Sequence, residues 1–158
     1  MFGLFSSPTI LDVELGELKR SRGMWRGHFS LQGDAAPLII DGPKNGPDPD
    51  AMKLAKSIAG QYPSWRTAIE NALAQHLAPY AEAIASGDLP TPEEPLPEMR
   101  YPGDVWPHVV LEFVAVMPLD GKPTIEFGYR VTWDDEHTLG ARFQDGRLIE
   151  LCGSVLCP

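Results

Sequence analysis

The chain has 158 residues, enough for one domain, with 43% apolar and 22% charged residues, as is ordinary for a soluble protein. Its net charge of −9 is concentrated in residues 70–158, whereas residues 1–69 are nearly balanced. An acidic surface repels phosphate backbones, which argues against nucleic-acid binding and is explained either by a basic protein partner or simply by solubility. The longest apolar run, Val109 to Met117, is interrupted by Glu112 and is too short to span a membrane.

The first residues, Met1–Phe5, are apolar but lack a basic flank and a full hydrophobic stretch. We therefore interpret them as a chain terminus and not as a signal peptide, and we expect a cytoplasmic location. Two cysteines, Cys152 and Cys157, lie close together near the end of the sequence. Reduced thiols are the ordinary state in the cytoplasm, although the spacing alone leaves pairing open.

Residues 12–41 predict an antiparallel meander. Gly16–Arg20 and Met24–Leu31 read as two strands joined by a turn, and Ala36–Asp41 supplies a third. Consecutive strands this close in sequence pair most simply with their neighbours.

Residues 48–86 predict two helices. Asp48 is a suitable N-cap, and Pro49 fits the first helical position. Tyr62 precedes a proline and is predicted to end the first helix, since proline disfavours the α conformation of the residue before it. The second helix should run from about Ser64 to Ser86, with a kink or break near Ala78 caused by the proline that follows it.

Residues 90–107 hold six prolines and several carboxylates, a composition typical of a stiff, extended and mostly solvated crossing. Strands follow over about residues 108–152, starting with Val109–Met117. The strand Thr124–Trp133 alternates clearly, with an apolar face made of Ile125, Phe127, Tyr129, Val131 and Trp133. Leu139–Phe143 and Arg147–Leu151 complete the predicted set.

The order of strands, helices and strands predicts an α+β fold. We expect an antiparallel sheet of about six to seven strands with both helices packed on one face. Residues 1–158 are predicted to form a single domain, because neither half alone has enough sheet and helix to close a core.

Several short motifs occur in a familiar order: Leu15-Gly16-Glu17-Leu18, Trp25-Arg26-Gly27, Ile40-Asp41-Gly42, and Trp133-Asp134-Asp135-Glu136-His137-Thr138-Leu139-Gly140. Taken together they resemble a family of small bacterial domains of unknown function. The resemblance spans most of the chain and implies a bacterial, cytoplasmic α+β domain. It brings no established activity and therefore no catalytic residues.

The densest polar chemistry is the predicted turn made of Asp134, Asp135, Glu136 and His137. Carboxylates bind hard cations, and a neighbouring histidine can bind a transition metal. Four consecutive side chains rarely converge, however, so the alternative is that the aspartates cap turn amides while the other two residues face solvent. We predict no catalytic, metal or cofactor site.

A second candidate is Trp106, which stands between prolines in the crossing. A partly exposed aromatic side chain on a stiff loop is a good interface anchor, but it can equally clamp the loop onto the domain. Scattered histidines and the absence of nucleotide-binding or nucleophile motifs give no further site.

Two functional interpretations follow. The first is a non-enzymatic, protein-binding module with an acidic surface that covers a basic partner, as immunity proteins do, with Trp106 and residues 134–137 as its binding residues. The second is a small metal-dependent hydrolase that uses the Asp134–His137 turn with help from Glu112, Glu126 or Arg130. Self-assembly through a free sheet edge is a third possibility, and the oligomeric state stays open.

Overall fold

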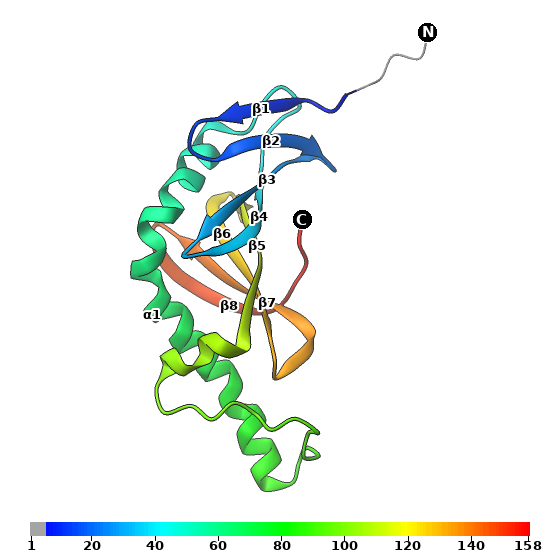
Figure 1. The fold of residues 1–158 in the computed structure, drawn as a ribbon, viewed down its shortest axis with the longest axis vertical. Coiled ribbons are helices and arrows are strands. Elements are labelled where there is room, and N and C mark those ends of the chain that lie inside the picture. Colours follow the sequence, from blue (N-terminus) through cyan, green and yellow to red (C-terminus); the bar gives the residue numbers. More distant parts are fainter. Residues whose placement is uncertain (1–5) are drawn as a thin grey trace.

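The fold is taken from a computed structural model that describes residues 6–158 (Figure 1). The predicted terminus Met1–Phe5 lies outside these residues. In chain order the elements are β1 (Thr9–Asp12), β2 (Gly16–Ser21), β3 (Met24–Leu31), β4 (Asp34–Ile40), α1 (Pro49–Ser86), the 3-10 helix η1 (Pro102–His108), β5 (Val109–Leu119), β6 (Lys122–Val131), β7 (Asp134–Gln144) and β8 (Arg147–Val155).

Within residues 6–158 the strands form one eight-stranded sheet in which spatial order follows chain order. The predicted α+β class is confirmed, but the predicted count of six to seven strands is too low. The additional strand is β1, which pairs with β2 across a turn that the Asp12 carboxylate closes by accepting hydrogen bonds from the backbone N–H groups of Glu14 and Leu15 at 2.8 and 2.9 Å. Four residues are too few for an alternating pattern to be visible in the sequence.

The sheet is antiparallel except at β4 and β5, which pair in parallel from Leu38 opposite Val114 to Ile40 opposite Val116. The prediction of a wholly antiparallel sheet is therefore wrong at this pair. Residues 41–108 leave the sheet, cross over through α1 and η1, and return beside β4 in the same direction, which is the connection that parallel neighbours require.

The helical region differs from the prediction of two helices, because α1 is a single helix of 38 residues. Its predicted ends are confirmed: Asp48 accepts a hydrogen bond from the Ala51 N–H, and Gly87 adopts the left-handed conformation with φ 83°. The predicted end at Tyr62 is wrong. The helix also continues without a break past Ala78 and through the proline that follows it.

Tertiary contacts explain how α1 continues through Pro63. A proline inside a helix costs about 3 kcal/mol through a lost hydrogen bond and a clash with the preceding turn. On one side of Pro63, the Tyr62 hydroxyl bonds the Tyr129 hydroxyl at 2.8 Å in the core. On the other side, the Trp65 ring packs on Phe143 with centroids 4.7 Å apart. Packing against the sheet thus outweighs the local preference that the sequence expresses.

The predicted crossing at residues 90–107 is only partly correct. Residues 90–101 contain neither helix nor strand, but the last part of the segment belongs to η1. The Asp104 carboxylate accepts hydrogen bonds from the Arg100 and Tyr101 N–H groups at 2.8 and 3.1 Å, which starts this 3-10 helix. Its Val105 side chain is fully buried and anchors η1 to the fold, while Pro102, Gly103 and Pro107 stay exposed.

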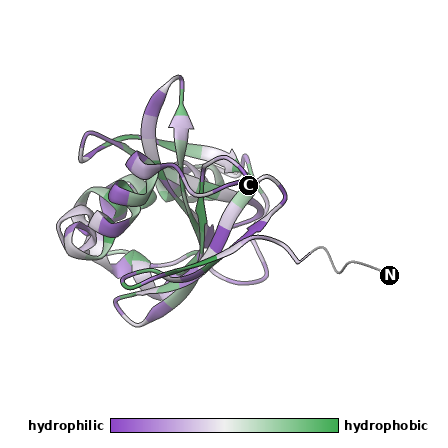
Figure 2. Ribbon diagram, turned by 90° about the horizontal axis from the view of Figure 1, so that it is seen from above, coloured by the Kyte–Doolittle hydropathy of each residue, from purple (hydrophilic) through white to green (hydrophobic). Residues whose placement is uncertain are grey.

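The two faces of the sheet differ in what packs on them. Figure 1 shows α1 running along the sheet, and Figure 2 shows from above that the strands curl beside it. The predicted apolar face of β6 is confirmed, because its residues join the core beneath α1. We call the other side of β4–β8 the open face. Its buried apolar cluster is small and consists of Ile39, Phe113, Ala115 and Val155.

Candidate functional site

The predicted acidic turn is organised around Asp134, which is buried at 9% exposure. Its carboxylate accepts hydrogen bonds from the Tyr80 hydroxyl at 3.0 Å and from the backbone N–H groups of Glu136 and His137, each at 3.2 Å. The His137 Nδ1 atom lies 3.0 Å from the same carboxylate. Asp134 therefore fixes the start of β7 and ties it to α1.

The protonation of this group follows from its contacts. Burial alone raises the pKa of Asp134, but the hydrogen bonds from His137, Tyr80 and the turn amide outweigh it, and the pKa is lowered overall. Burial also raises the pKa of Tyr80 and lowers that of His76. The Trp133 indole donates to His76 Nδ1 at 3.0 Å, so the His76 proton resides on Nε2 in the neutral imidazole.

The side chains of the other predicted site residues do not join this network. Asp135 and Glu136 are exposed. Trp106 is half-buried: its indole donates to Glu70 Oε2 at 2.8 Å, and the Arg66 guanidinium lies over its ring at 4.0 Å. Trp106 therefore connects η1 to α1.

The charged residues of the neighbouring strands form their own pairs. Glu112 lies 3.5 Å from Arg130 and accepts from Thr138, whereas Glu126 lies 2.6 Å from Arg142. The carboxylates that the hydrolase hypothesis adds to the turn, Glu112 and Glu126, are therefore already paired with other side chains. Across residues 6–158, no group of three or more His, Cys, Asp or Glu side chains is placed to hold a metal ion.

Both cysteines are free thiols, and Cys152 is half-buried. None of the helices in the part of the chain that the structure describes is long and apolar enough to cross a membrane.

A hollow of about 580 Å³ lies beside the turn. We call it the acidic groove. Two of its carboxylates, Glu93 and Glu94, come from the crossing, and a third, Asp135, comes from β7. The remaining lining is mostly apolar or aromatic and consists of Pro92, Pro95, Leu96, Pro97, His108, Thr132 and Trp133.

The groove includes one predicted binding residue, Asp135, and two that sequence reasoning leaves as solvated linker, Glu93 and Glu94. In the sequence, both glutamates stand among prolines, which hold them at fixed places on an extended segment. This position is the feature by which they could have been recognised as binding residues. What the sequence does not reveal is that this segment runs beside the β6–β7 turn, since that depends on the path of the chain in space after α1.

Comparison with known proteins gives one family. A family model described as a domain of unknown function, DUF6985, matches residues 14–155. No curated protein and no solved structure matches the chain. The resemblance to an uncharacterised family is therefore confirmed, and the match covers β2 through β8. The chain belongs to the DUF6985 family, a domain of unknown function.

Proposed function

We propose that this protein is a non-enzymatic binding module that holds a basic, extended segment of a partner protein in the acidic groove. The observation that carries the proposal is the meeting of Glu93 and Glu94 with Asp135, from segments far apart in the sequence, around one hollow with apolar walls. Lysine and arginine side chains suit such a groove, because their hydrocarbon stems cover apolar surface while their charged ends reach carboxylates.

The walls of the groove are also preorganised for binding. Pro92, Pro95 and Pro97 give the crossing a restricted backbone, so little conformational entropy is lost when it binds. The acidic balance of residues 70–158 adds long-range attraction that speeds the encounter with a basic partner. By contrast, the Asp134 carboxylate already has four hydrogen-bonding partners within the domain, which supports a structural role for it.

The test uses decalysine carrying a fluorescent label, with binding followed by fluorescence anisotropy. The groove variant combines Glu93→Gln, Glu94→Gln and Asp135→Asn. The matched control combines Glu17→Gln, Asp50→Asn and Glu82→Gln, which removes the same charge from exposed positions outside the groove. Since each exposed charge pair contributes up to about 1 kcal/mol, we expect the groove variant to bind about tenfold more weakly than the control.

Salt provides the second arm of the test. The Debye screening length falls from about 30 Å at 0.01 M to about 3 Å at 1 M ionic strength. The attraction between decalysine and the groove should therefore weaken steeply over this range. Equal affinities of the groove variant and the control would contradict the proposal, because attraction would then come from net charge alone. Failure of the unmodified protein to bind decalysine at low salt would contradict it as well.

A further inference from the structure

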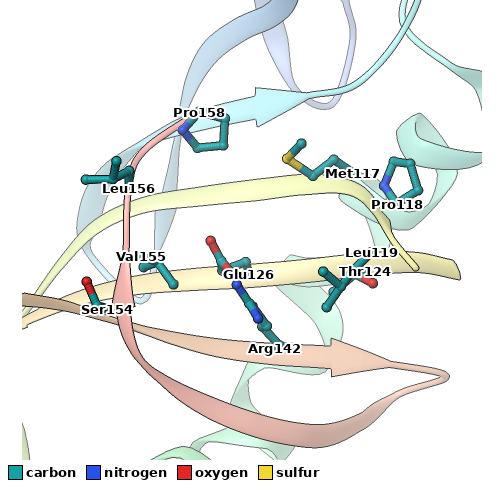
Figure 3. Close-up of a pocket in the computed structure, with 10 residues that line it drawn as sticks. All are labelled: Met117, Pro118, Leu119, Thr124, Glu126, Arg142, Ser154, Val155, Leu156 and Pro158. Carbon is teal, nitrogen blue, oxygen red and sulfur yellow. Dashed lines mark hydrogen bonds and ion pairs between the residues drawn. The ribbon is translucent and has the colours of Figure 1, made fainter. Parts of the chain in front are cut away.

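A second hollow, of about 370 Å³, lies on the open face of the sheet at the opposite end of β6 from the acidic groove (Figure 3). Figure 3 shows Glu126 and Arg142 between residues 154–158 on one side and residues 117–119 on the other. The volume is at the lower end of the range of about 300–1,000 Å³ that small-molecule sites occupy. We call this hollow the open-face cavity.

Two charged residues, Glu126 and Arg142, line the cavity, and Arg142 is shared with a second carboxylate, Glu150, which lies outside the lining. Arg142 donates from Nε to Glu126 Oε2 at 2.6 Å and from Nη1 to Glu150 Oε1 at 2.8 Å. These two carboxylates raise the pKa of Arg142, so the guanidinium stays charged. One cation against two carboxylates leaves one negative charge uncompensated, and two of the nitrogens that an anionic ligand would need are already bound.

The position of Glu126 is determined by its neighbours. A Cβ at Gly140 would lie 2.6 Å from Val155 Cγ1 and 3.2 Å from the Glu126 carboxylate, so only glycine leaves room for both. Among the described residues the second oxygen, Glu126 Oε1, accepts no hydrogen bond, and it is not fully buried. That oxygen is therefore free to accept a hydrogen bond from a ligand.

The remaining surface of the cavity is largely apolar. Met117, Leu119, Val155 and Leu156 supply hydrocarbon walls. The Thr124 hydroxyl donates to the Lys122 carbonyl and accepts from the Gln144 amide, each at 2.9 Å, so its hydrogen bonds are already made within the fold. A ligand thus meets one available carboxylate oxygen, Ser154 and a largely hydrocarbon lining.

We propose that the open-face cavity binds a small aliphatic primary amine, whose ammonium group donates to Glu126 Oε1 while its hydrocarbon chain packs on Met117, Leu119 and Val155. An ammonium ion supplies the charge that the Glu126–Arg142–Glu150 group lacks. An alcohol of the same length fits the walls but brings no charge, and a carboxylate brings the wrong one.

The experiment is a titration of the ¹⁵N-labelled protein with n-hexylamine, n-hexanol and hexanoate at neutral pH, followed by NMR. Hexylammonium should cause saturable shifts at residues 117–126, Gly140 and Val155, with at least about tenfold tighter binding than hexanol, because a charge-assisted hydrogen bond is added. Equal binding of hexylamine and hexanol, tighter binding of hexanoate, or no saturable shifts would each overturn the proposal.

Two variants sharpen the result. Glu126→Gln should weaken hexylammonium binding about tenfold or more, since the amide carries no charge. Glu112→Gln is the matched control, because Glu112 is a half-buried carboxylate on β5 that pairs with Arg130 and does not line the cavity. Equal weakening by the two variants would overturn the assignment of Glu126. The comparison of the three ligands on the unmodified protein needs no variant, so it stands even if Glu126→Gln folds poorly.

Discussion

The two faces of β6 are built from alternate residues of one strand and meet different surroundings. Under α1, Phe127 and Tyr129 are at most 1% exposed, and Phe127 packs against aromatic rings from the helix and from β7. On the open face, Glu126 is half-buried in an ion pair, and Arg130 is mainly exposed. The covered face holds the fold together, whereas the incompletely covered face leaves charged groups and a cavity accessible to solvent.

The largest effect should follow from emptying the covered face. Phe127→Ala removes a fully buried ring that contacts Tyr62, Trp65 and Phe143. We expect the free energy of unfolding to fall by about 3–5 kcal/mol, measured by urea denaturation. Arg130→Ala on the same strand is the control and should change it by less than about 0.5 kcal/mol, because its side chain is 61% exposed. Similar losses for both would abolish the distinction between the faces.

The next effect concerns the small cluster on the open face. A Cβ at Gly128 would lie 2.2 Å from the buried Phe113 ring, so Gly128→Ala must displace that ring. Overpacking of this kind costs about 1–3 kcal/mol of stability. Combining it with Phe113→Leu should cost less than the sum of the two single changes, because the smaller side chain makes room. Strict additivity in denaturation experiments would show that the ring and the glycine are not in contact.

Ion pairs on the open face should contribute more to the free energy of unfolding the more deeply their side chains are buried. Glu126→Gln weakens a pair whose side chains are 15% and 21% exposed, and we expect a loss of about 1–3 kcal/mol. Glu112→Gln weakens a pair in which Arg130 is 61% exposed, and the loss should stay below about 1 kcal/mol. Thermal unfolding of the two variants in parallel gives the comparison. A larger loss for Glu112→Gln would reverse the order that burial predicts.

The smallest effect is a pH dependence at the far edge of the sheet. The Lys56 ammonium, together with the Leu15 and Glu14 amides, lowers the pKa of Asp12 from 3.8 to about 2. Because this folded-state pKa is depressed, its contribution to stability is present above about pH 4 and is lost as the pH falls through about 2. In Asp12→Asn, stability should therefore decline less over this interval than in the unmodified protein. Identical acid profiles would contradict a structural role for this carboxylate.

The sequence predicts those parts of the fold that depend on local patterns. Alternation in Ile125–Val131 identifies the buried face of β6, and Asp48 with Gly87 marks both ends of α1. Local rules fail at Pro63, where Tyr62 and Trp65 anchor the helix to the sheet on both sides. They also fail at β1, whose four residues show no readable period.

The candidate site is harder to predict, because its parts come together only in three dimensions. The dense run of polar residues at 134–137 draws attention in the sequence, yet Asp134 is used to close its own turn and to bind Tyr80. Glu93 and Glu94 read as linker residues, and only the path of the chain after α1 brings them beside Asp135. Tertiary structure decides whether carboxylates from different segments line one hollow. The periodicity of the sequence does not predict it.

The central claim is that the acidic groove is the binding surface, and zero-length carbodiimide cross-linking of decalysine tests it most directly. The reagent joins a lysine amine only to a carboxylate that touches it, and mass spectrometry then identifies the residue. We predict that Glu93, Glu94 and Asp135 carry most of the cross-links at low salt and lose them at high salt. Cross-links spread evenly over exposed carboxylates outside the groove, such as Glu17 and Glu82, would contradict the claim.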